Sequence, residues 1–479
     1  MKVKYLVLAL SLIIAKGSSK EPVEWIKTGT MQGVTTVFDL ACDSESNVYA
    51  AIEISPPGVL GVSAGAADTG KVLKSTDDGM HWEPTGDIPN FNAKAVLCLL
   101  IARDGTIYCG TTDRGDIGRV YKSEDGGETW VSTGPIPNVD QSIYCLLEGK
   151  DGTIYAGGGY TESKIWKSTN KGASWILTGK LGGRSVRSLL ELPDGTIYAG
   201  TVLGTGMIDT TTWVYKSTNK GQTWERTGEF PEAKVLVVFS MDYDEKNDIL
   251  YAGTGVVDTN YTPPISVPKV FKSFDKGKSW VELGSISKDA GETVKSIIKS
   301  DSGVLYIGTL WGITGDENRR GRAWIFKSTD DYHISESGRF GDVSTSNGVS
   351  AIVQAPNGIL YAGIIGPPAG VYKNTTEKIT GVEEKKSPSL KFTSLPNPFA
   401  KSIEVSYQLS TPAKVSLKIY DASGGLVKTL VDEFQLPGSY QTLWNGRDRE
   451  ENPVPNGVYF FEFKTGKERE VKKVVRLFQ

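Results

Sequence analysis

Arginines, carboxylates and aromatic residues gather in short segments that differ from one repeat of this sequence to the next. The residues best suited to hold a ligand are Asp113, Arg114, Arg184, Tyr261, Trp311, Arg320 and Trp324. Arginine binds carboxylates through paired hydrogen bonds, and an aromatic ring covers the apolar face of a sugar or a side chain. These residue types therefore favour a glycan or a peptide as ligand, although solvated loops carry the same types.

The residue types that the chain lacks constrain its chemistry. Its only histidines, His81 and His333, fall in turns of the repeat and not in the variable segments. A Ser-His-Asp triad or a histidine metal site is therefore not expected, and we predict no metal and no cofactor. An enzyme built on this sequence would have to use carboxylates and tyrosines, as glycoside hydrolases do, and no residue can be assigned to catalysis.

A repeated strand organises most of the chain. The pattern Ile-Tyr-Ala-Gly, or a close variant, is centred on Tyr49, Tyr108, Tyr155, Tyr198, Tyr251, Tyr306 and Tyr361. Each copy follows an apolar strand that ends in a turn, and a third strand with a Lys-Ser pair comes after it. Seven units of about 50 residues predict an all-β fold over residues 22–373, a seven-bladed β-propeller with four strands in each blade.

The turn after the Lys-Ser strand carries the motif Ser-x-Asp-x-Gly-x-x-Trp. The motif is intact at Ser75, Asp77, Gly79 and Trp82, at Ser123, Asp125, Gly127 and Trp130, and at Ser273, Asp275, Gly277 and Trp280. Asn170 and Asn219 replace the Asp in two more copies. Ser and Asp side chains hydrogen-bond turn amides, Gly supplies a positive φ and Trp covers the hairpin. Together the copies resemble the Asp-box, or BNR, repeat of sialidase-type propellers.

What this resemblance implies about activity is limited. In such propellers the box is structural and lies away from the active face. Sialidases of this repeat family use an arginine triad, a Tyr/Glu pair and an Asp, and usually carry an early Arg-Ile-Pro motif. This chain has no Arg-Ile-Pro, and its first blade holds no arginine. Sialidase-like and xyloglucanase-like hydrolases stay as alternatives, with their carboxylates unassigned.

Segment lengths indicate which face of the propeller is variable. From each Lys-Ser serine to the next repeat tyrosine the distance is 30 to 34 residues, whereas from each tyrosine to the serine of its own blade it ranges from 13 to 26. Variation is therefore concentrated between the second and third strands. Because strands alternate in direction, these loops lie opposite the box turns, together with segments that contain Tyr160, Arg184 or Arg339. Function on a rigid scaffold usually resides in such loops.

The two ends of the propeller are expected to close on each other. The last repeat lacks a Trp strand after Lys373, while the N-terminal region offers an extra one from Trp25 to Gly29. Trp25 lies 24 residues before Tyr49, within the range of 23 to 27 that the other Trp residues show. We predict that residues 24–29 pair with the third strand of the last blade and remove both open edges.

The N-terminal residues and the net charge indicate where the protein works. Lys2 and Lys4 precede a short apolar run, and small residues near Ala15 offer a cleavage site, so we expect a signal peptide at residues 1–17. No other segment is long and apolar enough to predict a transmembrane span in the mature chain. The net charge of -3 lacks the basic excess of a nucleic-acid binder. These features predict a secreted or cell-surface protein with no nucleic-acid partner.

The cysteines show no metal-ligand spacing. Cys42, Cys98, Cys109 and Cys145 all fall in strands of the first repeats. An exported protein permits disulfides, and Cys98 and Cys109 flank one hairpin and are candidates to share a sheet face. Buried free thiols are the equally weighted alternative.

A different β-domain follows a polar linker at residues 374–389. Short alternating strands over residues 390–479 suit an immunoglobulin-like sandwich. Matching features are Asn397-Pro398-Phe399, Ile419-Tyr420-Asp421, Trp444-Asn445-Gly446 and Asn456-Gly457-Val458-Tyr459. They resemble FlgD-like C-terminal modules and type IX secretion sorting domains, and the resemblance implies secretion machinery as a partner. The alternative is an ordinary accessory sandwich.

These patterns together predict an exported, non-catalytic propeller that binds a glycan or another surface macromolecule through its variable loops. A glycoside hydrolase that relies on carboxylates is the first alternative. An assembly or stability factor for a membrane complex is the second, and it rests on fold analogy.

Overall fold

The structure, a computed structural model, describes residues 25–54, 69–89, 93–113, 117–140, 142–203, 212–231, 234–260, 265–311, 321–341, 347–366, 369–374, 391–395, 397–409, 413–435, 438–465 and 468–477. The expected signal peptide, and the expected linker beyond residue 374, lie outside these ranges. Apart from the 3-10 helix η1 (Lys288–Ala290), all helices and strands of the described residues are β-strands. No helix in these ranges is both long and apolar enough to cross a membrane.

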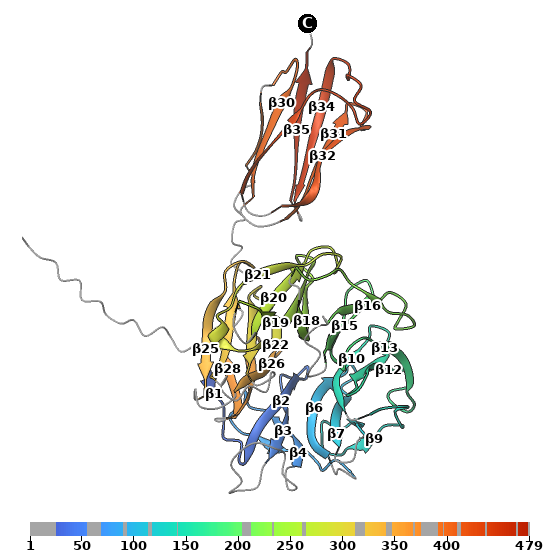
Figure 1. Cartoon of the computed structure of the whole chain (residues 1–479), viewed down its shortest axis with the longest axis vertical. Coiled ribbons are helices and arrows are strands. Elements are labelled where there is room, and N and C mark those ends of the chain that lie inside the picture. The colour runs from blue at the N-terminus through green and yellow to red at the C-terminus, as the bar shows by residue number, and fades with distance from the viewer. Residues whose placement is uncertain are drawn as a thin grey trace, which may run out of the picture.

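The strands before residue 375 pair into antiparallel groups of four, which we call blades (Figure 1). Blade 1 holds β2 (Val34–Cys42), β3 (Val48–Ile54), β4 (Thr69–Ser75) and β5 (Glu83–Pro84), and blade 2 holds β6 (Ala93–Ile101), β7 (Ile107–Asp113), β8 (Val120–Ser123) and β9 (Val131–Ser132). Blade 3 holds β10 (Ile143–Glu148), β11 (Ile154–Gly158), β12 (Ser163–Ser168) and β13 (Ile176–Leu181), and blade 4 holds β14 (Ser185–Glu191), β15 (Ile197–Val202), β16 (Val214–Ser217) and β17 (Glu225–Arg226).

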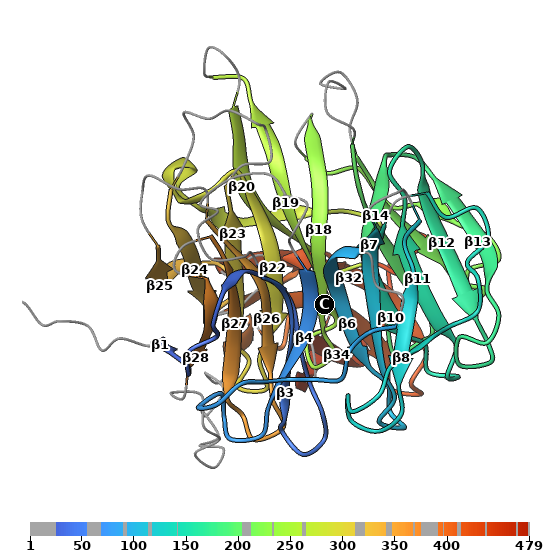
Figure 2. The ribbon, with the colours of Figure 1, turned by 90° about the horizontal axis from the view of Figure 1, so that it is seen from below.

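Three further blades complete the set. Blade 5 holds β18 (Val235–Asp244), β19 (Ile249–Asp258), β20 (Ile265–Ser273) and β21 (Val281–Ser285), and blade 6 holds β22 (Thr293–Lys299), β23 (Leu305–Leu310), β24 (Ala323–Ser328) and β25 (Ser335–Phe340). Blade 7 holds β26 (Gly348–Gln354), β27 (Leu360–Ile365), β28 (Gly370–Asn374) and β1 (Ile26–Lys27). The first strand of each blade contacts that of the next, and β26 contacts β2, which closes the ring of blades seen in Figure 1 and viewed from the side in Figure 2.

Closure by the N-terminal strand is confirmed. In β1, Ile26 pairs with Lys373 and Lys27 pairs with Tyr372 of β28. Trp25 is only 3% exposed, and its indole nitrogen donates a hydrogen bond to the Ser337 hydroxyl at 2.9 Å. The strand therefore completes blade 7 and covers part of blade 6.

The second strands explain the Tyr-Ala-Gly pattern. Because each blade is covered on both faces, the first five residues of its second strand are buried, and the repeat tyrosines are among them. The glycine lets the next blade approach, since a Cβ atom on Gly157 would lie 2.8 Å from Val186 of β14. Gly253 stands in the same relation to Val294 of β22, at 2.6 Å. The repeat thus encodes both the strand and the close packing of its neighbour.

All four cysteines are free thiols. The expectation that Cys98 and Cys109 share a sheet face is wrong, because Cys98 lies opposite Gly110 in the pairing of β6 and β7 and Cys109 lies opposite Leu99. Neighbouring positions of a strand point to opposite faces, so these two thiols enter different core clusters.

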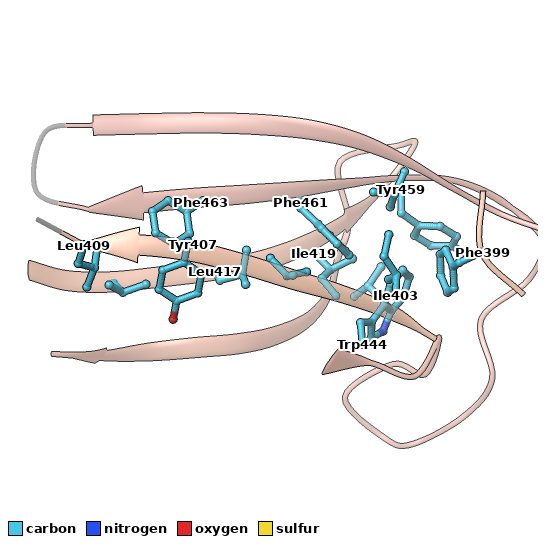
Figure 3. Packing of buried hydrophobic residues seen from close by; sticks show 14 residues of the cluster. Phe399, Ile403, Tyr407, Leu409, Leu417, Ile419, Trp444, Tyr459, Phe461 and Phe463 are labelled. Atoms are coloured by element: carbon cyan, nitrogen blue, oxygen red, sulfur yellow. The ribbon is translucent and has the colours of Figure 1, made fainter. Parts of the chain in front are cut away.

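The C-terminal strands form a two-sheet sandwich. One sheet contains β29 (Lys391–Leu395), β30 (Ile403–Leu409) and β33 (Gly438–Trp444), and the other contains β31 (Ala413–Asp421), β32 (Leu426–Gln435), β34 (Gly457–Thr465) and β35 (Glu468–Arg476). Their inner faces meet in one core in which Trp444, Phe461 and Phe463 are fully buried (Figure 3). The prediction of an all-β chain with a propeller followed by an immunoglobulin-like sandwich is confirmed.

Candidate functional site

The box residues fold a turn through contacts among themselves. In blade 2 the Ser123 hydroxyl donates to the Asp125 carboxylate at 2.7 Å and accepts the amide of Gly127 at 2.8 Å. Asp125 also accepts the amide of Thr129 at 2.9 Å. The boxes of blades 1 and 5 repeat these bonds, and the two Asn-containing boxes form them with the Asn side-chain oxygen.

Backbone geometry explains the glycine of the box. Two consecutive residues take positive φ, as Lys276 (56°) and Gly277 (79°) do in blade 5. Such a φ strains a residue with a side chain, and at Gly277 a Cβ atom would also lie 3.1 Å from Thr227 of blade 4. Glycine at this position therefore serves both the turn and the contact between blades.

Each box also ties its blade to the preceding one. The Gly127 carbonyl of blade 2 accepts the amide of Gly86, which follows blade 1, at 2.8 Å. The Trp130 indole donates to the Thr85 hydroxyl at 3.2 Å. Equivalent pairs of bonds join the preceding Thr-Gly segments to the boxes of blades 1 and 3. In blades 1, 2 and 3 the indole and turn groups are thus bonded to protein, which supports a structural role, whereas the buried indole nitrogens of Trp224 and Trp280 in blades 4 and 5 have no hydrogen-bond partner among the residues that the structure describes.

The histidines belong to these turns. Hydrogen bonds from the His81 amide and ring lower the pKa of Asp77 to about 2, and the His81 Nδ1 atom lies 2.5 Å from its carboxylate. His333 holds Asp330 of blade 6 in the same way, at 2.6 Å. Both imidazoles therefore bind carboxylates of their own turns. These turns lie at the edge of the propeller opposite the variable loops, which we call the box edge.

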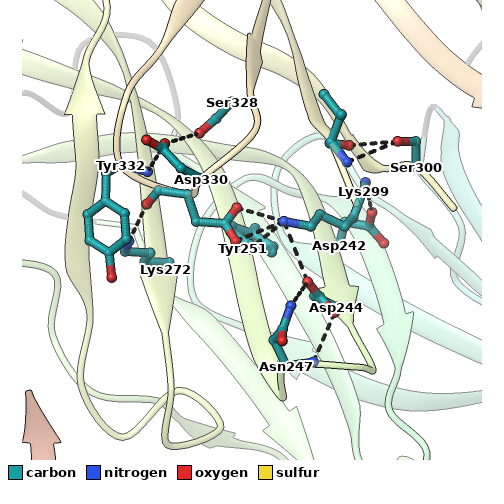
Figure 4. A network of polar contacts seen from close by, with 12 residues as sticks. Asp242, Asp244, Asn247, Tyr251, Lys272, Lys299, Ser300, Ser328, Asp330 and Tyr332 are labelled. Carbon is teal, nitrogen blue, oxygen red and sulfur yellow. Dashed lines mark hydrogen bonds and ion pairs between the residues drawn. The ribbon is translucent and has the colours of Figure 1, made fainter. Parts of the chain in front are cut away.

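The box of blade 6 has no box glycine or tryptophan, and a buried ionic network stands in its place (Figure 4). The Lys299 ammonium lies 2.7 Å from the Asp331 carboxylate and 3.5 Å from that of Asp244 in blade 5. Lys272 of blade 5 donates to the Asp331 carbonyl and lies 3.9 Å from the centre of the Tyr332 ring. Burial lowers the pKa of Lys272 to about 8. Because these charges neutralise one another across blades 5 and 6, we interpret the network as a contact that stabilises the packing of the two blades.

On the variable-loop face, Arg184 and Tyr160 form a stacked pair. The guanidinium carbon lies 3.9 Å from the centre of the Tyr160 ring, and Arg184 Nε donates to the Tyr160 carbonyl at 2.7 Å. Asp140 holds the loop by accepting the amides of Tyr160 and Thr161 at 3.3 and 3.2 Å. Tyr160 is 39% exposed, so the pair presents an aromatic ring and a cation to solvent. We call it the loop-face pair.

Two other expected site residues lie in blade 6. Trp324 faces Arg339 across β24 and β25, with the guanidinium carbon 4.0 Å from its ring, and Arg339 also pairs with Glu336. Trp311 is 7% exposed, and its indole donates to the Arg322 carbonyl at 3.1 Å, so this ring faces protein and not solvent.

The structure cannot place the remaining expected residues. Arg114, Tyr261 and Arg320 lie outside the described residues, and so does the side chain of Asp113, which ends β7. Among the described residues of the expected set, Arg184 thus belongs to a stacked pair in blades 3 and 4, Trp324 belongs to another in blade 6, and Trp311 belongs to neither.

A second group of polar residues surrounds the propeller centre. Each first strand carries a β-bulge or an irregularity of register near its start, where one residue lacks a partner on the second strand. At the level that all seven strands share, the unpaired residues are Phe38, Leu97, Tyr144, Arg187, Phe239, Lys295 and Ser350, and β2, β6 and β18 have a second irregularity closer to their start. Bulges commonly redirect a side chain, and here they occur at one level of the ring, toward the variable loops.

Four of these residues form a continuous series, which we call the axial arc. The Arg187 guanidinium carbon lies 3.4 Å from the centre of the Tyr144 ring and 5.8 Å from that of Phe239. The Lys295 ammonium lies 4.7 Å from the centre of the Phe239 ring. Aromatic and cationic side chains therefore alternate across blades 3, 4, 5 and 6, and solvent reaches all four in part.

Electrostatics of the arc reflect two cations close together. Burial lowers the pKa of Lys295 to about 8, and the Arg187 charge acts in the same direction. Burial also lowers the pKa of Arg187. Asp39 of blade 1 is the nearby carboxylate, and burial raises its pKa to about 6 although the amides of Leu99 and Leu40 donate to it.

Sequence reasoning missed this arc, yet a signal was present. Each first strand contains an aliphatic residue, then the bulge residue, then Asp, Cys, Ser or Ala, as in Val186-Arg187-Ser188 and Val294-Lys295-Ser296. Arginine and lysine at the variable position of an otherwise apolar strand mark a side chain that leaves the core.

Among the described residues, no group of three His, Cys, Asp or Glu side chains has the arrangement to hold a metal ion.

Comparison with known proteins identifies the second domain. The FlgD Ig-like domain family matches residues 397–468. No curated protein matches this chain.

Solved structures resemble the chain in fold. Virginiamycin B lyase from Staphylococcus aureus, crystallised as an inactive variant with quinupristin, is 15% identical over 73% of this chain and 98% of its own, with a TM-score of 0.51. PorZ, a surface component of the type IX secretion system of Porphyromonas gingivalis, is 15% identical over 92% of this chain, with a TM-score of 0.48. The chain spans 59% of the length of PorZ. At this low identity, the structural similarity to the lyase shows a shared propeller-type fold and nothing about activity.

Proposed function

We propose that this protein is an exported, non-catalytic binding protein that holds a glycan or another surface macromolecule on its variable-loop face. The observation that carries the proposal is the loop-face pair, in which Arg184 is stacked on the exposed ring of Tyr160. A pre-ordered aromatic ring beside a cation offers stacking and hydrogen bonds with little loss of side-chain entropy.

The surrounding carboxylates favour binding over catalysis. Asp140 is occupied by loop amides and by Lys164 at 3.6 Å, and Glu162 pairs with Lys180 at 3.1 Å. A hydrolase needs one carboxyl group to act as acid and another as base or nucleophile. Since both carboxylates near the pair lie in contact with lysines, their arrangement supports binding better than proton transfer.

The C-terminal sandwich supports the exported location. Its match to the FlgD Ig-like domain, and the Lys472-Lys473-Val474-Val475 segment in β35, fit a module that engages secretion machinery. Removal of residues 391–479 is expected to leave the protein in the periplasm of its native host. Cell fractionation checks this, and normal surface delivery of the shortened chain would contradict the secretory role.

A glycan array tests the binding role. The full chain is expected to bind a defined subset of glycans, and Tyr160→Ala with Arg184→Ala is expected to weaken that signal at least tenfold. Lys171→Ala, an exposed change in the box turn of blade 3, is the matched control and should leave binding unchanged. Product release from bound glycans would replace the binding role with the hydrolase alternative.

A further inference from the structure

The axial arc places two cations near one aromatic ring at the centre of the propeller. Arg187 and Lys295 come from β14 and β22, and both lie within 6 Å of the Phe239 ring centre. Arg187 is also stacked on Tyr144 of β10 at 3.4 Å. A guanidinium stacked on a ring keeps its N–H groups free in its own plane, where they can donate to an acceptor.

Neither cation is neutralised by direct contact. Among the described residues, no carboxylate forms an ion pair with Arg187 or Lys295, and Arg187 Nε donates to the neutral Ser185 hydroxyl at 3.0 Å. Asp39 attracts Lys295 at longer range, but its two oxygens accept the amides of Leu40 and Leu99 at 2.9 and 2.8 Å. The arc therefore carries excess positive charge in a partly enclosed position.

Lys299 of blade 6 offers a contrast to the two cations of the arc. The enclosed cation Lys299 has Asp331 and Asp244 as partners. Unpaired like charges that are removed from bulk water destabilise a protein, so a site that keeps them normally has a counter-ion. The aromatic neighbours fix the positions of the cations without neutralising them.

We propose that the axial arc is a binding site for a doubly charged oxyanion, sulfate or phosphate. Arg187 supplies paired donors and Lys295 supplies a point charge, and their two positive charges exceed the single negative charge of the nearby Asp39. The anion can be free or can be a group on a larger ligand. This site goes beyond the function proposed for the loop-face pair, because an inorganic anion would occupy it whether or not the loops bind a glycan.

Calorimetric titration of the full chain with sodium sulfate and with sodium phosphate, at pH 7 and constant ionic strength, tests the site. Saturable binding is expected with at least one of the two anions. Arg187→Gln and Lys295→Gln should each weaken it at least tenfold. Arg226→Gln is the matched control and should not change the affinity. Arg226 lies on β17, the outermost strand of blade 4, and its guanidinium carbon is 4.8 Å from the centre of the Trp213 ring. Absence of saturable binding, or equal affinity in all variants, would overturn the proposal.

Two further comparisons keep the test decisive. If Arg187→Gln does not fold, Lys295→Gln is compared with Lys295→Arg, which keeps the charge. Retained binding in the Arg variant with loss in the Gln variant supports the site, and equal loss in both overturns it. Competition by dextran sulfate but not by dextran would show that the site accepts the anion as a group on a larger ligand. Binding of the inorganic anion alone would assign it a free anion.

Discussion

The box edge and the opposite half of the propeller use polar residues in contrasting ways. At the box edge, hydroxyls and carboxylates bond within the same turn, as Ser123 does. Indoles there bond to the segment that follows the preceding blade, as Trp130 does. Toward the variable loops, Arg184, Arg187 and Lys295 are stacked on aromatic rings. The difference teaches that the most recognisable motif of the chain stabilises the ring, whereas the residues proposed to bind a partner stand at positions whose residue type varies from blade to blade.

The largest effect is expected where the ring closes. Trp25→Ala should lower the free energy of unfolding by about 3–5 kcal/mol, because it empties a buried site and weakens the closing strand. Ile26→Ala on the same strand is the control, since Ile26 is 48% exposed. Urea denaturation measures both, and equal losses would show that closure depends on β1 pairing and not on Trp25.

The next effect is a difference in stability between changes at a box tryptophan and at the tyrosine of the loop-face pair. Trp130→Ala is expected to cost about 3–5 kcal/mol of unfolding free energy, because Trp130 is 4% exposed. Tyr160→Ala should cost less than about 1 kcal/mol, as for most surface changes. A loss at Tyr160 as large as that at Trp130 would remove the distinction between the two faces.

A smaller, pH-dependent effect is expected at the axis. The folded-state pKa of Lys295, about 8, is below that of an unfolded lysine, so its charge opposes folding below pH 8 and this penalty disappears as the pH rises toward about 10.4. Burial is the main cause of the lowered pKa of Lys295, the Arg187 charge adds to it, and Asp39, Cys145 and Cys98 act in the opposite direction. Without added anion, Lys295→Met should therefore be more stable than the native chain at pH 7, and the gain should shrink by pH 10. A pH-independent difference in thermal denaturation would contradict this.

The smallest effect concerns acid. The pKa of Asp77 is about 2 in the folded protein, so its bonds to His81 stabilise the fold above pH 4 and are lost as the pH falls through 2. Asp77→Asn keeps a side-chain oxygen that can accept the His81 backbone amide. The side-chain oxygens of Asn170 and Asn219 accept the equivalent amides in blades 3 and 4. The variant should be slightly less stable at pH 6 and equal to the native chain near pH 2. Denaturation at both pH values checks the convergence.

Sequence patterns predicted the features that depend on local chemistry and repetition. The repeat spacing gave the order of strands, and the register of Trp25 predicted the closing strand, because each depends on residues a fixed distance apart. The short alternating strands expected over residues 390–479 are also present, among them β30 and β33.

Side-chain direction and tertiary neighbours were harder to predict. Cys98 and Cys109 flank one hairpin, but the β6–β7 register sends them to opposite faces. Trp311 lies in a variable segment and is nevertheless buried, with its indole donating to the Arg322 carbonyl. Arg187 and Lys295 are 108 positions apart in the sequence and meet only because bulges on two strands point to one centre. No pattern within one repeat contains that information.

Glycan-array binding of four full-length proteins tests the contrast between the two faces most directly. The native chain, Tyr160→Ala with Arg184→Ala, Lys171→Ala and Asp77→Asn are compared at equal folded concentration. We expect at least a tenfold loss for the double variant alone, with native signals for both box-edge variants. Native binding by the double variant, or a comparable loss in either box-edge variant, would contradict a binding role for the loop-face pair.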